Sequence, residues 1–416
     1  MFTTKQNSEI AACVAGFLKE HGYENAFKAY IAEAKMENEN LDYSKLNKDL
    51  EMKFFMVSRM QIKIAALEKQ LAELNKGYGT NPLQVNAVVD TNGYCVPRLP
   101  ELHTFTGHRG AVNCVLFHPV YTFFATASDD STIKIWDIGK QRCERTLSGH
   151  TDAVNDLAIS PDGRLLASCS NDMFVKIWDM TETFECVKTF AGHEHSISSV
   201  AFVRNNTVLT ASRDHFIKLW DLNSITCLQV FHDDTWVRTI RIHANGKYFA
   251  SSGSQICVWD VENGDRVVEL QEHTNVVEVI AWAPENVATE LKLGDSTFDD
   301  SGLSPNVYIE GKPLVLASGS RDSTIRIWHV NIRTCLFIVD DHTNWIHGLA
   351  WHPNGKTLMS VGDDKTLRSW NVGAKFASLK TYSPHQNFIR CLALDNTGKY
   401  AATGSTDHTI KLFECR

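Results

Sequence analysis

The stretch Ser128–Asp137, which reads SDDSTIKIWD, decides the fold. A Ser-x-Asp turn is followed by a short run in which isoleucine alternates with other residues before Trp136, and this period of two is typical of a β-strand. Nearly the same letters, SRDSTIRIWH, return at Ser320–His329. The repetition indicates that the chain contains several copies of one small β unit.

The tryptophan at the end of this strand recurs along the chain, with phenylalanine in its place once. The positions are Trp136, Trp178, Trp220, Trp259, Trp328, Trp370 and Phe413. All but one of the intervals are close to 40 residues, the length of a four-stranded propeller blade. With the Gly-His that begins most copies, the pattern is that of the WD repeat. It predicts an all-β, seven-bladed propeller over residues 101–416.

The last repeat ends at Arg416 after only three predicted strands. The segment Leu102–Phe105, just before the first Gly-His, has the pattern of the missing fourth strand. Pairing of the two ends would close the ring and remove exposed sheet edges, so we expect this pairing.

Six of the repeats carry a histidine and an aspartate at fixed positions. They are His108, His150, His193, His273, His342 and His385, with Asp130, Asp172, Asp214, Asp322, Asp364 and Asp407. A His-Ser-Asp set suggests a catalytic triad, but an active site needs only one copy. We therefore expect buried hydrogen-bonded networks that stabilise each blade, with no catalytic residue, metal or cofactor.

The fourth repeat departs from this pattern. Asp233 stands where the histidine belongs, and Gly253 stands where the aspartate belongs. This predicts that blade four lacks the network and is the least rigid blade.

Large aromatic residues are concentrated at one rim position, three residues after the repeat histidine. Trp236, Trp345 and Phe388 occupy it on blades four, six and seven, and Arg238, His347 and Arg390 follow two residues later. Arg321 and Lys365 add charge from the turn before the third strand. Exposed tryptophan beside arginine is typical of interface hot spots and suits an acidic partner. The alternative is that the aromatic rings pack between blades.

Blade five contains an insertion at about 286–312, which is acidic and rich in Gly, Ser and Pro. The spacing places it between the first two strands of the blade, on the face opposite the rim. We expect a loop there, tolerated rather than functional.

The first hundred residues predict a dimerisation arm. Residues 1–40 contain a helix pair with apolar residues at helical spacing, namely Ile10, Val14, Phe17, Leu18 and Phe27. Residues 50–76 show a coiled-coil seam of Val57, Met60, Ile64, Leu67, Leu71 and Leu74. The alternative for this seam is a helix packed on its own propeller. Residues 77–100, with several Gly and Pro, are interpreted as a linker.

Composition limits the classes of partner. The net charge is −8, which does not suit a phosphate backbone, and no apolar run is long enough to span a membrane. The 11 cysteines include no C-x-x-C pair, which favours a reducing, cytoplasmic location without a zinc site.

The helix pair around Gly22 and Tyr23, with Phe27, resembles a LisH motif. A LisH motif, a short coiled coil and seven WD repeats together resemble the lissencephaly (nuclear distribution) protein family. This resemblance implies a non-catalytic, dimeric regulator of cytoplasmic dynein, the minus-end-directed microtubule motor, acting with NudE-type coiled-coil proteins. It implies roles in nuclear positioning, mitosis and transport, a place at the cytoskeleton and the centrosome or microtubule-organising centre, and motor contacts through Arg238, Arg321, Trp345 and Lys365.

Two alternatives remain open at this point. LisH and WD repeats also occur together in substrate receptors of ubiquitin ligases. In vertebrates, the lissencephaly family also associates with a platelet-activating-factor acetylhydrolase as its regulatory subunit.

Overall fold

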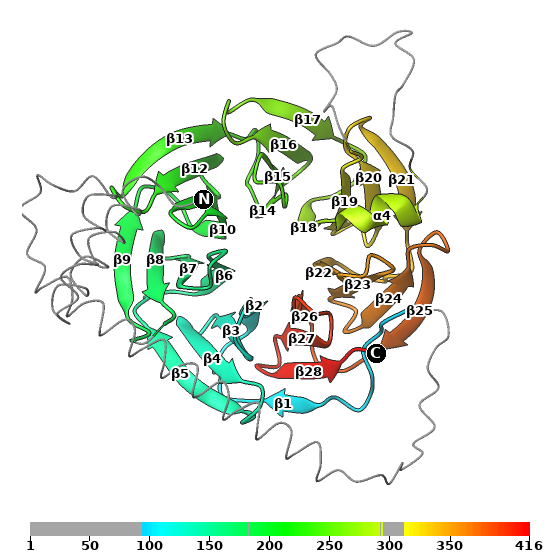
Figure 1. Ribbon diagram of the computed structural model, residues 1–416, viewed down its shortest axis with the longest axis horizontal. Helices are drawn as coiled ribbons and strands as arrows, with labels where there is room; N and C mark the ends of the chain where they lie inside the picture. The colour runs from blue at the N-terminus through cyan, green and yellow to red at the C-terminus, as the bar shows by residue number, and fades with distance from the viewer. Residues whose placement is uncertain (1–93, 182, 292, 294–311) are drawn as a thin grey trace, which may run out of the picture. The chain divides into compact units, whose positions relative to one another are not determined.

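The computed structural model describes residues 94–181, 183–291, 293 and 312–416. These residues form seven four-stranded antiparallel sheets arranged around a central axis (Figure 1). The predicted seven-bladed propeller is therefore confirmed. The helix pair, the coiled coil and their dimerisation residues lie outside the described residues.

Each blade is a simple meander, with its first strand nearest the axis and its last strand outermost (Figure 1). Blade one consists of β2 (Val112–Phe117), β3 (Phe123–Ser128), β4 (Thr132–Asp137) and β5 (Arg142–Ser148). Blade two consists of β6 (Val154–Ile159), β7 (Leu165–Ser170), β8 (Phe174–Asp179) and β9 (Cys186–Ala191). Blade three consists of β10 (Ile197–Arg204), β11 (Thr207–Ser212), β12 (Phe216–Asp221) and β13 (Thr226–His232).

The remaining blades follow the same order. Blade four consists of β14 (Thr239–Ile242), β15 (Tyr248–Ser252), β16 (Ile256–Asp260) and β17 (Arg266–Leu270). Blade five consists of β18 (Val277–Trp282), β19 (Val315–Ser320), β20 (Ile325–His329) and β21 (Thr334–Val339). Blade six consists of β22 (Ile346–Trp351), β23 (Thr357–Gly362), β24 (Leu367–Asn371) and β25 (Ala377–Tyr382).

Blade seven is assembled from both ends of the described chain. Its strands are β26 (Ile389–Leu394), β27 (Tyr400–Ser405), β28 (Ile410–Glu414) and β1 (His103–Phe105). β1 pairs antiparallel with β28, with His103 opposite Leu412 and Phe105 opposite Ile410. The expected closure is confirmed.

The pairing of the two ends extends beyond β1. The Val96 and Arg98 amides donate hydrogen bonds to the carbonyls of Arg416 and Glu414, and the Tyr382 hydroxyl donates to the Pro97 carbonyl over 2.8 Å. Residues 94–100, which the composition assigned to a linker, are thus part of the edge of blade seven. Gly and Pro break helical periodicity, but an extended segment can still pair at a sheet edge.

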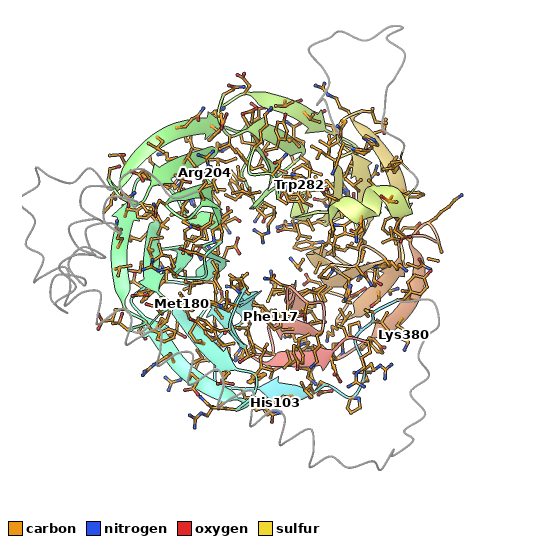
Figure 2. The ribbon with its side chains drawn as sticks, in the orientation of Figure 1. His103, Phe117, Met180, Arg204, Trp282 and Lys380 are labelled. Carbon is orange, nitrogen blue, oxygen red and sulfur yellow. The ribbon has the colours of Figure 1, made fainter. Side chains whose placement is uncertain are left out.

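The hydrophobic cores lie between blades, because both faces of each sheet are covered by a neighbour. One core joins Ile133 and Ile135 of blade one to Leu166 and Trp178 of blade two. In Figure 2, Phe117 and Trp282 lie at the inner side of the ring, whereas His103 and Lys380 lie at its circumference. Because the cores lie between the blades, the loops at the ends of the inner strands remain available at the two faces of the ring.

The insertion of blade five lies between β18 and β19, as predicted, but its first part is not a loop. Residues Glu285–Glu290 form a short helix, α4, which buries Val287 completely. Val287 packs in the same core as Trp351 and Phe376 of blade six. This tertiary contact, rather than helix propensity, accounts for the helix. Residue 292 and residues 294–311 lie outside the described part of the chain.

A candidate protein-binding face

The repeated histidines and aspartates form the expected internal networks. In blade one, His108 Nδ1 donates to Asp130 over 2.8 Å, and the Thr126 hydroxyl donates to His108 Nε2 over 2.7 Å. Trp136 Nε1 completes the chain by donating to Thr126 over 2.8 Å. The same His-Asp and His-Ser or His-Thr bonds recur in five other blades.

The protonation states of the network residues agree with a structural role inside each blade. Burial lowers the pKa of His108, His150 and His193, so these imidazoles remain neutral at neutral pH. Burial alone would raise the pKa of Asp130, but hydrogen bonds from Thr132, the Arg109 amide and His108 lower it to about 2. Both ring nitrogens of each network histidine are engaged within its own blade.

Blade four lacks the His-Asp pair, as predicted, but it keeps a shorter network that the sequence pattern did not predict. The Ser251 hydroxyl donates to Asp233 over 2.9 Å, and Trp259 Nε1 donates to Ser251 over 2.9 Å. Asp233 is buried, and burial raises its pKa. The Asp233 carboxylate accepts a hydrogen bond from the Ser251 hydroxyl, as the imidazole accepts one in the other six blades. The histidine pattern in the sequence could not indicate that an aspartate takes this place. The expected low rigidity of this blade stays a prediction.

The predicted aromatic residues are exposed rather than packed between blades. Trp236 is 51% exposed, Trp345 is 38% exposed and Phe388 is 37% exposed. Each precedes the inner strand of its blade, and the backbone places the turn before the third strand beside it. The Arg321 amide, for example, donates to the Val276 carbonyl, and the Asp363 amide donates to the Trp345 carbonyl. All the predicted rim residues therefore lie on one face of the propeller.

Part of this rim is a connected group of side chains, which we call the Arg-Trp cluster: Arg238, Glu278, Arg321 and Trp345. The Arg321 guanidinium carbon lies 4.2 Å from the centre of the Trp345 ring. Arg321 Nε lies 2.5 Å from Glu278 Oε1, and Arg238 Nε lies 3.9 Å from the same oxygen. Three neighbouring blades thus contribute to one continuous surface.

The charges in this cluster influence one another. Burial lowers the pKa of Arg238; the neighbouring Arg321 and Arg213 lower it further, while Glu278 opposes them. The guanidinium groups are therefore close enough to repel, and Glu278 offsets part of that repulsion. An acidic partner would offset more of it.

Sequence reasoning missed the role of Glu278. Glu278 occupies the same repeat position as Arg238, His347 and Arg390. The signal in the sequence was that this position holds one acidic residue where the neighbouring blades have basic or imidazole side chains. Glu278 and Arg321 of blade five join two of the predicted residues, Arg238 of blade four and Trp345 of blade six.

The remaining predicted residues lie on the same face but outside the Arg-Trp cluster. Lys365 has a positive φ of 64° and donates from Nζ to the Gln386 carbonyl over 2.9 Å. The centre of the His347 ring lies 6.3 Å from that of Trp345, and His347 Nε2 lies 3.0 Å from Asp363 Oδ1. No contact found among the described residues connects Trp236, Phe388 or Arg390 to the cluster.

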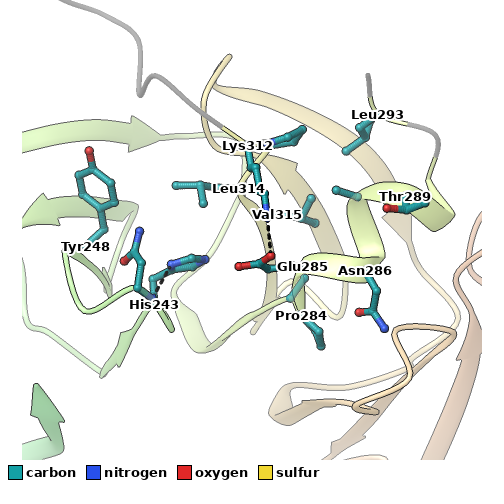
Figure 3. Close-up of a pocket in the computed structure, with 14 residues that line it drawn as sticks. His243, Tyr248, Pro284, Glu285, Asn286, Thr289, Leu293, Lys312, Leu314 and Val315 are labelled. Atoms are coloured by element: carbon teal, nitrogen blue, oxygen red, sulfur yellow. Dashed lines mark hydrogen bonds and ion pairs between the residues drawn. The ribbon is translucent and has the colours of Figure 1, made fainter. Parts of the chain in front are cut away.

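A separate pocket of about 680 Å³ lies at the opposite face, beside α4. Figure 3 shows His243 and Tyr248 of blade four on one side and Glu285 and Lys312 of the insertion on the other. Glu285 and Lys312 form an exposed ion pair of 2.8 Å. This pocket contains none of the predicted site residues.

No helix among the described residues is long and apolar enough to cross a membrane. Nor does that part of the chain contain a group of three or more His, Cys, Asp or Glu side chains able to hold a metal ion.

The repeats match the family model of the WD domain, G-beta repeat. The matched residues are 99–137, 141–179, 184–221, 225–260, 302–329, 333–371 and 376–414. The chain is therefore a WD-repeat β-propeller protein.

Comparison over the whole chain narrows this class. The chain is 34% identical over 372 residues to nuclear distribution protein nudF of Emericella nidulans, covering 86% of this chain and 80% of that protein. It is 33% identical over 413 residues to nuclear distribution protein PAC1 of Arthroderma otae, covering 94% and 88%. PAC1 of Ajellomyces capsulatus is 34% identical over 413 residues. The chain belongs to the nuclear distribution (lissencephaly) protein family.

Proposed function

We propose that this chain is a non-catalytic, dimeric scaffold that binds the motor domain of cytoplasmic dynein through the Arg-Trp cluster. The observation that carries the proposal is an exposed tryptophan stacked beneath an arginine, with a second arginine alongside, on one face of the ring. The names of the relatives, which refer to nuclear distribution, support a role in the dynein pathway.

The proposed cellular role follows from that partner. The scaffold would regulate dynein in nuclear positioning, mitosis and microtubule-based transport, together with NudE-type coiled-coil proteins. It would act in the cytoplasm, on the cytoskeleton and at the centrosome or microtubule-organising centre. Two propellers on one dimeric arm would raise the effective concentration for a partner with two sites.

The test is the affinity of the purified full chain for a purified dynein motor domain. Truncating a hot-spot residue of an interface costs about 2 kcal/mol or more, and about 1.4 kcal/mol corresponds to tenfold in Kd. Arg321→Ala and Trp345→Ala should each weaken binding at least about tenfold.

A matched control is Tyr121→Ala, because Tyr121 is also an exposed aromatic residue but follows the end of β2 and lies on the opposite face. It should leave the affinity unchanged. If Arg321→Ala and Trp345→Ala bind as tightly as the wild type, the Arg-Trp cluster is not the motor-binding site.

A further inference from the structure

Two arginine side chains from neighbouring blades converge on a single carboxylate oxygen. Arg321 and Arg238 both approach Glu278 Oε1 with Nε as the nearest atom. The Glu278 side chain is only 12% exposed, whereas those of Arg321 and Arg238 are 24% and 19% exposed. Glu278 therefore lies under the two arginines rather than beside them on the surface.

This arrangement leaves one edge of each guanidinium available. A guanidinium is a planar fork with five N–H donors, and the use of Nε leaves the terminal Nη1 and Nη2 groups. No described residue accepts a hydrogen bond from the Nη atoms of Arg238 or Arg321. Glu278 thus accepts the hydrogen bond of Arg321 Nε and lies within ion-pair distance of Arg238 Nε, while the outer edges, formed by the Nη groups, have no acceptor among the described residues.

Trp345 restrains Arg321 from another side. Its ring lies 4.2 Å from the guanidinium carbon, within the range of a cation–π contact. A side chain held both by an ion pair and by an aromatic ring loses less conformational entropy when a partner binds. The orientation of Arg321 is therefore preorganised by Glu278 and Trp345 together.

We propose that Glu278 is a positioning residue of the partner-binding face, which orients Arg238 and Arg321 so that their outer edges bind an acidic side chain of the partner beside Trp345. The proposal rests on the function proposed above for this face. It names the chemistry recognised there, a carboxylate on an acidic protein segment.

The substitution Glu278→Gln distinguishes an effect of charge on partner binding from an effect of arginine positioning, because the two change the affinity in opposite directions. Removal of a negative charge would strengthen binding to an acidic partner if only the electrostatic potential mattered. If Glu278 positions the arginines, the same substitution weakens binding to the dynein motor domain, by about fivefold or more. Glu278→Asp keeps the charge but withdraws it by one methylene, and it should weaken binding too. Unchanged or tighter binding of Glu278→Gln would overturn the proposal.

Asp129→Asn is the matched control. Asp129 occupies on blade one the turn position that Arg321 occupies on blade five, and it accepts a hydrogen bond from Asn113 over 2.7 Å. The substitution adds the same charge to the same face without touching the Arg-Trp cluster. Its affinity should equal or slightly exceed that of the wild type, and a loss equal to that of Glu278→Gln would contradict the positioning role.

A second readout does not depend on dynein. In the full chain labelled with 5-fluorotryptophan, the Trp345 resonance can be assigned by its loss in Trp345→Phe. It should shift in Glu278→Gln and in Arg321→Ala but not in Asp129→Asn, with thermal midpoints confirming that each variant is folded. A Trp345 resonance that does not respond to Glu278→Gln would refute the positioning role. A response without binding of the wild type to dynein would instead refute only the proposed partner.

Discussion

A single residue distinguishes blade four from its neighbours. Asp233 replaces the network histidine and is buried against Ser251. Burial raises its pKa, whereas the pKa of Asp172 in blade two is lowered because hydrogen bonds from Phe174, His150 and Thr151 outweigh its burial. The two carboxylates therefore affect stability with opposite signs.

We predict that Asp233→Asn raises the thermal midpoint at about pH 7. A raised folded-state pKa means that the folded protein holds the proton more tightly than the unfolded chain does, so stability falls as pH rises through that pKa. The gain should shrink as the pH falls through the folded-state pKa of Asp233, because the wild-type carboxyl then becomes protonated as well. Asp172→Asn is the contrasting variant and should lower the midpoint at neutral pH. Equal effects of both substitutions would show that burial does not control Asp233.

At the scale of the element, one buried side chain anchors the outer strand of blade seven. Phe105 on β1 is buried, and its ring centre lies 5.1 Å from that of Phe124 and 5.4 Å from that of Trp136. β1 has only three residues, and Phe105 is the only one of the three that is buried. The strand that closes the ring therefore depends on Phe105.

We predict that Phe105→Ala lowers the free energy of unfolding by about 3–5 kcal/mol, the usual cost of truncating a buried phenylalanine. Leu102→Ala is the control, because Leu102 is exposed on the same segment and keeps its backbone hydrogen bond to Leu412. It should cost less than about 0.5 kcal/mol. Urea denaturation followed by tryptophan fluorescence would measure both, and similar losses for the two would argue against closure by Phe105.

At the scale of the whole molecule, a polar strut joins blades that are not neighbours. Arg241 on β14 donates to Asp156 on β6 over 3.0 Å and to Ser199 on β10 over 3.2 Å. Ser199 also donates to Asp156, and the Cys114 thiol of blade one donates to the other carboxylate oxygen over 3.3 Å. Four consecutive blades thus meet at one carboxylate, which ties the irregular blade four to the regular ones.

We predict that Arg241→Met lowers the free energy of unfolding by about 2 kcal/mol. The value lies between those for buried and surface pairs, because Asp156 is buried whereas the Arg241 side chain is 40% exposed. Adding Asp156→Leu should restore most of the loss, since no carboxylate then remains unpaired.

A second ion pair provides the control for this prediction. Arg204 and Glu262 also join two blades, but both side chains are more than 70% exposed. Arg204→Met should change the free energy of unfolding by less than about 0.5 kcal/mol. If Arg204→Met and Arg241→Met lower the free energy of unfolding by the same amount, the contact between Arg241 and Asp156 contributes no more to stability than an exposed ion pair.

The sequence by itself determined the propeller, its closure by Leu102–Phe105 and the six His-Asp networks. It also determined which face carries Trp236, Trp345 and Phe388. Each of these follows from a repeat position, and a repeat position depends on residues within one blade or on the register of the two ends. Local periodicity is enough to specify such features.

Only the tertiary structure decided which side chains from different blades touch. The contacts of Glu278 with Arg238 and Arg321, the strut from Arg241 to Asp156, and the helix α4 over blade six all join residues from separate repeats. Repeat spacing tells where a residue stands in its own blade, but the direction and reach of a long side chain across the ring depend on packing. The physical reason is that these contacts join residues far apart in the sequence, which only the packing of the blades against one another brings together.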